Sequence, residues 1–426
     1  MNETFLQRMR TTLSDFAEFE SVYGLPAQKG LRVNTLKVSV SDFKALSPFA
    51  LYSLPCGDEC FRIEEDKPGK SLYHDAGLFY VQEPSAMYPA TLLDVQSGER
   101  VLDLCSAPGG KGTQLAQKMQ GQGILVLNEK MPDRAKILAQ NVERLGVRNA
   151  VVTCADPDTL AERFPEYFDK ILVDAPCSGE GMFRKDPSSV SEWNENIVKM
   201  CAERQKKILS SAKKMLAVGG RLVYSTCTFS EEENEQNAEW YTRTFSDCKL
   251  ISMRKLYPHR DYGEGQFAAL FERTDGSRSE LKKHYLFSEK KEVALYRDFE
   301  RSFLYRPIEG DVFSFGNALC VAPQDLFVLH GLKVLRVGIP LGEIVKTGRK
   351  PRFEPNHSLA MCAEKKDLKN VADLNEVDAV RYLRGEEVGG YSVEGWCAVT
   401  FGGYPLGLAK GVGNLKNHYP KGLRHG

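Results

Sequence analysis

The sequence predicts an α/β protein in which a doubly wound parallel sheet is flanked by a smaller unit on either side. Two observations support this prediction. Between about 96 and 275, short apolar runs alternate with amphipathic stretches, which is typical of buried parallel strands joined by helical crossovers. The chain of 426 residues is also longer than one compact core accommodates, so further domains are expected at its ends.

The central region, 96–275, contains the elements of the sheet. The expected strands are 100–105, 123–129, 150–156, 168–176 and 220–228. The expected helices are 111–119, 131–145, 192–217 and 231–245. Gly219 and Gly220 follow the third of these helices, and glycine at this point is a typical helix stop.

The flanking regions have weaker patterns. Residues 1–95 predict an N-terminal α/β accessory domain, with a helix near 3–20 and a strand at 30–37. Residues 276–340 are less regular and are expected to form an intermediate domain or linker. Residues 341–426 are rich in glycine and short apolar runs, which predicts a small β-rich barrel.

The composition narrows the class of protein. Lys and Arg total 57 and Asp and Glu total 57, so any nucleic-acid surface must be a local patch. The apolar runs are of strand length and the N-terminus lacks a secretory pattern, so we expect no membrane span and a cytoplasmic location. The eleven cysteines are then expected to be free. Cys56 and Cys60 lack a second pair at zinc-ribbon spacing, so no metal is expected.

A glycine-containing turn follows the first expected strand and leads into a helix. It reads DLCSAPGGK over Asp103–Lys111. Gly109 and Gly110 allow backbone amides to approach a ligand at a helix N-terminus. The turn is neither a phosphate-binding P-loop nor a GxGxxG motif, and taken alone it could be a plain strand-to-helix connection.

Acidic residues end the next two expected strands. Glu129 stands where a doubly wound fold places a carboxylate on ribose hydroxyls, and Asp156 is placed to meet an adenine edge. Each could instead be a helix N-cap or a solvated strand end. Three such features at successive strand ends together indicate a nucleoside cofactor, but they do not distinguish S-adenosylmethionine from NAD.

Two cysteines follow the last two expected strands. Cys177 lies in Asp174–Gly179 (DAPCSG), and Cys227 lies in Ser225–Thr228 (STCT). If these strands are neighbours, their ends are roughly 5 Å apart. A lone cysteine is usually a small buried apolar residue, whereas two of them beside an acid and a cofactor site predict a reactive pair.

Such a pair suits the transfer of a methyl group to carbon 5 of cytosine. This carbon is a weak nucleophile until a thiolate adds to carbon 6 and turns the ring into an enamine. An acid near N3 must offset the charge that develops, and Asp174 is placed for this task. A base then removes the carbon 5 proton and the thiol is eliminated.

The chain resembles the Sun-type RNA (cytosine-5) methyltransferases, in particular their bacterial RsmF-like branch of 16S rRNA methyltransferases. The resemblance spans about 30–240. The matching segments are RVNT (32–35), YVQEPS (80–85), DLCSAPGGK (103–111), NEKMPDR (128–134), DAPCSGEGMFRK (174–185) and YSTCTFSEEENE (224–235). The loop departs slightly, since it reads CSAPGGKG where many relatives read C-A-A-P-G-x-K-T.

The resemblance implies a Rossmann-like S-adenosylmethionine methyltransferase sheet and assigns its residues. Cys227 would be the nucleophile, Cys177 would assist product release and Asp174 would lie beside the target base. In DNA cytosine methyltransferases the cysteine that corresponds to Cys177 attacks instead, and YSTCTFSEEENE favours the RNA arrangement. The implied S-adenosyl-L-methionine site comprises Cys105, Ser106, Ala107, Pro108, Gly109, Gly110, Lys111, Glu129, Arg134, Asp156 and Asp174.

The resemblance also implies RNA, specifically 16S rRNA of the small ribosomal subunit, as the partner of a monomeric protein. RNA would be held by the N-terminal domain and a C-terminal PUA-like domain. Residues 401–426 contain no acid; basic and aromatic residues suited to RNA are Lys410, Lys416, Lys421, Arg424, Tyr404 and Tyr419. A second basic cluster comprises Lys346, Arg349, Lys350 and Arg352.

Other functions stay open on the sequence alone. The same chemistry could act on transfer RNA or 23S rRNA, because substrate choice depends on surfaces. A non-catalytic ribosome-assembly factor would not be expected to retain Cys177, Cys227 and Asp174. An NAD-dependent dehydrogenase would not explain the paired cysteines, and the chain lacks GxGxxG.

Overall fold

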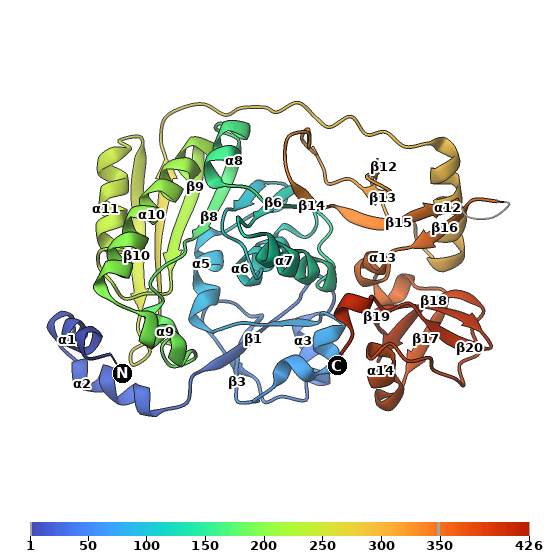
Figure 1. The fold of residues 1–426 in the computed structure, drawn as a ribbon, viewed down its shortest axis with the longest axis horizontal. Coiled ribbons are helices and arrows are strands. Elements are labelled where there is room, and N and C mark those ends of the chain that lie inside the picture. The colour runs from blue at the N-terminus through green and yellow to red at the C-terminus, as the bar shows by residue number, and fades with distance from the viewer. Residues whose placement is uncertain (1, 347–349, 426) are drawn as a thin grey trace.

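The computed structural model describes residues 2–346 and 350–425, and its centre is one large sheet (Figure 1). The eight strands lie in the order β10 (Cys248–Leu256), β11 (Gln266–Arg273), β9 (Leu216–Thr226), β8 (Phe168–Asp174), β5 (Arg100–Asp103), β6 (Ile124–Asn128), β7 (Ala150–Thr153) and β14 (Val334–Val337). From β9 to β7 all neighbours are parallel. The expected α/β sheet is therefore confirmed.

The edges of the sheet were not predicted. β11 and β10 extend it antiparallel beyond β9, and β14 pairs antiparallel with β7. β14 comes from the expected intermediate region, 276–340, so this region contributes a strand to the central sheet. The sheet is mixed because these outer strands reverse direction, while its inner strands keep the parallel crossover arrangement.

Helices cover both faces of the sheet. They are α5 (Tyr88–Leu93), α6 (Gly110–Met119), α7 (Pro132–Arg144), α8 (Pro157–Arg163), α10 (Glu195–Met215) and α11 (Glu235–Thr244), while the short α9 (Pro187–Glu192) lies in the connection between β8 and α10. Val101 and Leu102, consecutive on β5, are fully buried in two different apolar clusters. Successive side chains of a strand point to opposite faces, so each face has its own core.

The boundary between α10 and β9 differs from the prediction. α10 ends at Met215 and β9 begins at once at Leu216, so Gly219 and Gly220 lie inside the strand. Gly219 has φ of 72°, and the pairing of β9 with β8 shifts register nearby. The two glycines therefore mark a strand irregularity, and their interpretation as a helix stop was wrong.

The N-terminal unit combines short helices with a four-stranded sheet of order β2-β3-β1-β4. Its elements are α1 (Glu3–Thr12), α2 (Phe16–Ser21), β1 (Lys29–Val33), α3 (Val40–Leu46), β2 (Tyr52–Ser53), β3 (Cys60–Ile63), α4 (Leu72–Asp75) and β4 (Phe79–Val81). The single helix expected near 3–20 is thus two helices, and the strand expected at 30–37 ends at Val33.

The chain beyond β11 contains two further four-stranded sheets. The first begins within 276–340, where the sequence predicted an intermediate domain or linker, and the second lies within 341–426, where it predicted a small β-rich domain. The strands of the first sheet are β12 (Val312–Phe315), β13 (Ala318–Val321), β15 (Ile339–Val345) and β16 (Arg352–Pro355). The helices α12 (Lys290–Phe303) and α13 (His357–Cys362) pack against it. The strands of the second sheet are β17 (Val371–Leu374), β18 (Gly395–Phe401), β19 (Tyr404–Val412) and β20 (Asn414–Asn417), and α14 (Glu376–Leu383) packs against it. Short 3-10 helices lie at Val22–Gly24, Pro68–Lys70, Ser85–Met87, Glu180–Met182, Lys365–Asp367 and Lys421–Leu423.

The two ends of the chain share one apolar core. Leu31 and Phe79 of the N-terminal sheet belong to the same buried cluster as Leu374, Tyr382 and Val399 of the last sheet. Figure 1 shows the light-blue part of the N-terminal unit, around α3, beside the red C-terminal end of the chain, while α1 and α2 lie away from it. In the part of the chain that the structure describes, no helix has both the length and the apolarity that a membrane crossing requires.

Candidate active site

The residues predicted for the site gather at one edge of the central sheet. β5, β6, β7, β8 and β9 are parallel, so their carboxyl ends meet at this edge, which is where open α/β sheets bind ligands. The glycine turn joins β5 to α6, and Gly109 adopts φ of 112°, a left-handed conformation that favours glycine. The sequence thus places the turn, the acids and the thiols together.

The N-terminal unit holds the glycine turn in place through Arg32 of β1. The guanidinium of Arg32, 1% exposed, donates to Gly110 O at 3.0 Å and to Thr113 Oγ1 at 2.9 Å. A β-carbon at Gly112 would lie 2.5 Å from Ser106 Oγ. The serine hydroxyl at 106 and a side chain at 112 would therefore occupy the same space. This explains why the two departures from the common loop sequence, Ser106 and Gly112, occur together.

Glu129 and Arg134 are linked to this turn. Glu129 is buried and accepts the Met131 N–H at 2.9 Å. Arg134 Nη1 lies 3.4 Å from Glu129 Oε2, and its Nη2 donates to Ala107 O at 2.7 Å. Arg134 therefore connects the acid that follows β6 with the loop that follows β5.

Asp156 lies at the rim of the same edge. Its side chain caps α8 by accepting the Asp158 N–H at 3.2 Å, and it forms an ion pair with Lys130. The hydrogen bond from Lys130 lowers the pKa of Asp156. The N-cap alternative is thus realised, and the carboxylate is still 42% exposed, which leaves it accessible to a ligand.

The two thiols that the sequence singled out lie in contact. β8 and β9 are neighbours with Asp174 opposite Ser225, and the Sγ atoms of Cys177 and Cys227 are 3.3 Å apart. The hydrogen bond with Cys227 and burial both hold the pKa of Cys177 above its ordinary value. Burial likewise raises the pKa of the nearby Cys105 thiol, so both Cys105 and Cys177 favour the neutral thiol.

An ion pair that the sequence did not predict lies between the turn and the thiols. Lys111 Nζ is 2.7 Å from Asp174 Oδ2, and Ser225 donates its hydroxyl to Asp174 Oδ1 at 2.7 Å. Burial opposes the charge of Lys111, but the pairing with Asp174 leaves its pKa raised. The sequence assigned Lys111 only to the cofactor loop, whereas its ammonium group reaches the residue expected beside the target base.

The C-terminal residues separate into surface and core. Lys410 of β19 lies directly opposite Trp396 on one side and Lys416 on the other. Tyr419, in contrast, is 7% exposed and packs edge-on against His357 and Tyr382. The expectation that Tyr419 stacks on RNA was therefore wrong, because its ring belongs to the shared core.

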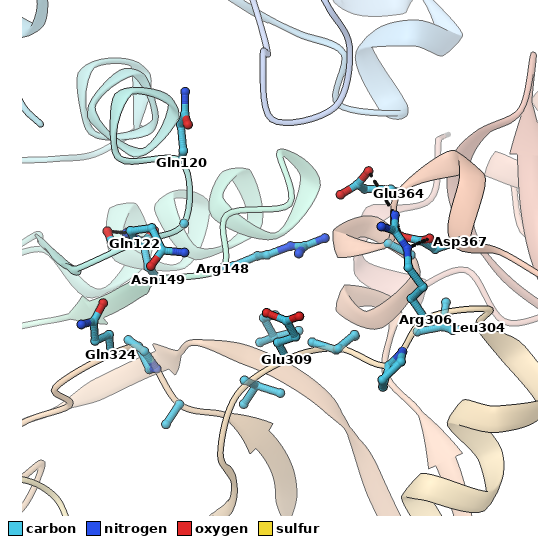
Figure 2. A pocket seen from close by; sticks show the side chains of 18 residues that line it. Gln120, Gln122, Arg148, Asn149, Leu304, Arg306, Glu309, Gln324, Glu364 and Asp367 are labelled. Atoms are coloured by element: carbon cyan, nitrogen blue, oxygen red, sulfur yellow. Dashed lines mark hydrogen bonds and ion pairs between the residues drawn. The ribbon is translucent and has the colours of Figure 1, made fainter. Parts of the chain in front are cut away.

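Two of the four residues of the second basic cluster form ion pairs with acids. Lys346 pairs with Glu292, and Arg352 pairs with Glu354, while Arg349 lies outside the described residues. A cavity of about 330 Å³ opens farther along, between the central sheet and the C-terminal part (Figure 2). It contains mixed charges such as Arg306 and Asp367, and none of the predicted site residues lines it.

Comparison with known proteins accounts for this arrangement. Family models match in sequence order: the N-terminal domain of 16S rRNA methyltransferase RsmF (1–84), 16S rRNA methyltransferase RsmB/F (90–274), the RsmF first C-terminal domain (298–362) and the RsmF PUA domain (369–425). Ribosomal RNA small subunit methyltransferase F of Vibrio cholerae is 33% identical over 99% of this chain and 97% of that protein. The chain belongs to the RsmF family.

Further relatives of this RsmF-family protein agree. The Escherichia coli ribosomal RNA small subunit methyltransferase F is also 33% identical, over 99% of this chain and 96% of its own. A methyltransferase homolog from Pyrococcus horikoshii is 31% identical with a TM-score of 0.55, covering 62% of this chain and 91% of that one. NSun6 from P. horikoshii, solved with SFG, shares the fold at 21% identity and a TM-score of 0.57, over 64% and 98% of the two chains. The RsmF-family chain is accordingly a methyltransferase with a C-terminal PUA domain.

Proposed function

We propose that the protein methylates carbon 5 of cytosine in 16S rRNA of the small ribosomal subunit, with S-adenosylmethionine as methyl donor and Cys227 as covalent nucleophile. The observation that carries the proposal is the contact of the Cys177 and Cys227 thiols at 3.3 Å, beside the Lys111–Asp174 pair. Membership of the RsmF family supports the RNA substrate, since the relatives of the chain are named for it.

The residues of the glycine turn fit S-adenosylmethionine. Glu129 would bind the ribose hydroxyls and Asp156 the adenine side, and the turn from Cys105 to Lys111 would hold the methionine part at the start of α6. When bound, the cofactor supplies an electrophilic sulfonium methyl group. A carboxylate at Glu129 suits hydroxyl donors, and the open backbone at Gly109 admits a ligand close to the chain.

The thiols would then act on the base in sequence. Cys227 adds to carbon 6, and the Lys111–Asp174 pair offsets the charge that develops toward N3. Carbon 5 becomes nucleophilic and takes the methyl group. Cys177 assists removal of the carbon 5 proton, so that the bond between carbon 6 and Cys227 breaks and the product leaves. The raised pKa of Cys177 suits this division, because a thiol that stays protonated is a poor competitor for attack on carbon 6.

The substrate assignment has a direct test. Bisulfite sequencing of ribosomal and transfer RNA from a deletion strain should show the loss of 5-methylcytosine in 16S rRNA, and expression of the wild-type protein should restore it. A loss confined to transfer RNA or 23S rRNA would retain the chemistry and change the substrate. Unchanged methylation in all three RNA classes would contradict the proposed function.

The cofactor site predicts a strong effect at Glu129. Calorimetry should show that Glu129→Ala weakens S-adenosylmethionine binding by roughly 10- to 100-fold, because a charged acceptor of ribose hydrogen bonds is lost. Asp133→Ala is a matched control, since Asp133 is exposed and its one ion pair within the described residues is with Lys136. Equal binding by Glu129→Ala, or preferential binding of NAD by the wild type, would contradict this site.

The C-terminal row Trp396–Lys410–Lys416 supports an RNA contact. The three residues are direct cross-strand neighbours on β18, β19 and β20, and Lys410 Nζ lies 5.8 Å from the Trp396 ring centre. Like charges directly opposite each other are unfavourable in a sheet. Within the described ranges neither lysine forms an ion pair with an acid, so the row favours an anionic partner whose bases can stack on the ring.

Neutralising this row should weaken RNA binding in a salt-dependent way. In Lys410→Gln/Lys416→Gln, the slope of log affinity against log salt concentration should decrease by roughly 1.5, since each lost phosphate contact removes about 0.7–0.9. S-adenosylmethionine binding should not change. The matched control is Lys346→Gln/Arg352→Gln, in which both removed charges are already paired with Glu292 and Glu354. The same slope in both double variants would show that the row is only a solvated surface.

A further inference from the structure

Buried polar side chains hold the backbone on both sides of Cys177. Gln205 of α10 donates from Nε2 to Pro176 O at 3.0 Å, and the Ser178 N–H donates to Glu233 Oε2 at 3.1 Å. The same Gln205 nitrogen donates to this Glu233 oxygen at 2.7 Å. Gln205 and Glu233 are both 0% exposed, so these bonds are shielded from water. The Cys177 loop is thereby attached to a helix of the core.

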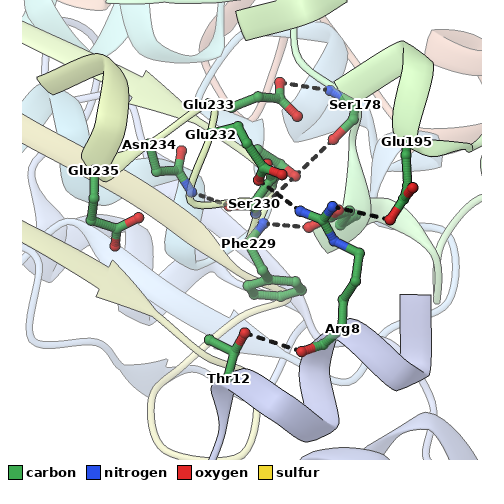
Figure 3. A network of polar contacts seen from close by, with 12 residues as sticks. Arg8, Thr12, Ser178, Glu195, Phe229, Ser230, Glu232, Glu233, Asn234 and Glu235 are labelled. Carbon is green, nitrogen blue, oxygen red and sulfur yellow. Dashed lines mark hydrogen bonds and ion pairs between the residues drawn. The ribbon is translucent and has the colours of Figure 1, made fainter. Parts of the chain in front are cut away.

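A second buried residue does the same for Cys227. The Thr226 hydroxyl donates to Asn234 Oδ1 at 2.6 Å, and Asn234 Nδ2 donates to Thr228 O at 2.9 Å. The hydroxyls of Ser178 and Thr228 are 2.8 Å apart and join the two loops. In Figure 3 Ser178, Glu233 and Asn234 surround the chain that follows Cys227.

Glu233 differs from its neighbours in the acidic run Glu231–Glu233. Glu231 is exposed, and Glu232 pairs with Arg8 at 2.6 Å, whereas Glu233 points inward and has no cationic partner among the described residues. Burial raises its pKa to about 7, and its Oε1 has no hydrogen-bond partner. Burying such a group is costly, so its presence calls for a compensating role. Among the described residues, its side chain accepts hydrogen bonds only from the Ser178 N–H of the Cys177 loop and from Gln205.

We propose that Glu233, acting with Gln205, is a positioning residue that holds the Cys177 thiol against Cys227 and thereby sets the rate of product release. The proposal rests on the division of labour between the two thiols described above. Glu233 itself does not touch the base; it acts through the backbone of Ser178. Asn234 fixes the nucleophile loop in the same manner, so the SEEENE segment serves both cysteines.

The test compares Glu233→Ala with Glu233→Gln. Both donors converge on Oε2, so glutamine can keep both hydrogen bonds through its amide oxygen, whereas alanine loses them. Glu233→Ala should lower kcat by roughly 10- to 100-fold, the effect of a displaced catalytic group, with an unchanged KM for RNA. It should also accumulate a covalent protein–RNA complex, whereas a merely structural defect would lower activity without this complex. Glu233→Gln should retain most of the activity.

A readout without RNA separates this proposal from the proposed function. Diamide, which takes one hydrogen from each of two thiols to form a disulfide, should oxidise the Cys177–Cys227 pair more slowly in Glu233→Ala than in the wild type. Glu232→Ala is the matched control, since among the described residues its side chain makes polar contacts only with Arg8, in an ion pair, and Ser230, through a hydrogen bond. The positioning role would be overturned if Glu233→Ala left both the oxidation rate and kcat unchanged. It would also be overturned if the alanine and glutamine variants lost the same fraction of activity. If Cys177→Ala did not trap RNA but oxidation were still slowed in Glu233→Ala, the proposed roles of the two thiols would be wrong. The positioning role of Glu233 would then still hold.

Discussion

Replacing Cys227 by alanine is expected to abolish methylation, with kcat reduced more than about 10⁴-fold. The magnitude follows from removing the nucleophile of a covalent mechanism, where the remaining groups act only through it. Tritium transfer from labelled S-adenosylmethionine to RNA measures the rate, and denaturing electrophoresis measures covalent protein–RNA complex. Cys227→Ala should show neither, while its S-adenosylmethionine affinity should be unchanged.

A matched control excludes a general effect of losing a sulfur atom. Cys320 lies on β13 in the C-terminal part, is 1% exposed and is not part of the site, so Cys320→Ala should remain active. If Cys227→Ala retained activity near the wild-type level, covalent catalysis through this thiol would be excluded. A loss of S-adenosylmethionine binding in Cys227→Ala would indicate a misfolded site and call for Cys227→Ser, which differs by one atom and should be equally inactive.

Replacing Cys177 by alanine is expected to have a different and equally large effect. Attack by Cys227 and methyl transfer should still proceed, but removal of the carbon 5 proton should be slow, so the enzyme stops after one turnover. A protein–RNA complex that survives denaturing electrophoresis should therefore accumulate. Multiple-turnover activity should fall by about 10²- to 10⁴-fold, the usual contribution of a proton-transfer group.

The double variant Cys177→Ala/Cys227→Ala distinguishes the roles of the two thiols. It should trap nothing, because the trap requires the nucleophile. The opposite pattern, a complex in Cys227→Ala and none in Cys177→Ala, would reverse the assignment and correspond to the arrangement of DNA cytosine methyltransferases. The two Sγ atoms are 3.3 Å apart, so position alone does not decide which of them attacks.

The sequence predicted the inner sheet because its strands are apolar on both faces and are separated by helical periodicity. It missed β14, since the four residues Val334–Val337 are too short to be distinguished from any apolar run in a loop. It also misplaced the end of α10, because Gly219 and Gly220 are typical both of a helix stop and of a strand irregularity. The local sequence does not distinguish a helix stop from a strand irregularity, whereas the pairing of β9 with β8 shows that the glycines lie within a strand.

The candidate site was predictable as far as it depends on strand order. Neighbouring strands bring Cys177 next to Cys227 wherever the rest of the chain lies. The Lys111–Asp174 pair was missed because it depends on the side-chain direction at the start of α6. Glu233 was missed because three consecutive acids indicate a solvated surface, and only the tertiary fold turns one of them inward. Tyr419 was misassigned for the same reason, since a tyrosine among lysines indicates a surface and the fold buries it.

The apolar core shared by the two ends of the chain has a consequence for how the protein is made. During synthesis the N-terminal sheet leaves the ribosome first, but Leu31 and Phe79 complete their packing only with Leu374, Tyr382 and Val399, which are translated last. Contacts this distant in sequence form slowly. The apolar face of the N-terminal sheet therefore stays uncovered until the C-terminal sheet has been synthesised. Nascent chains stalled before residue 369 should be readily cut by protease within 1–84. The full-length protein should resist cleavage there.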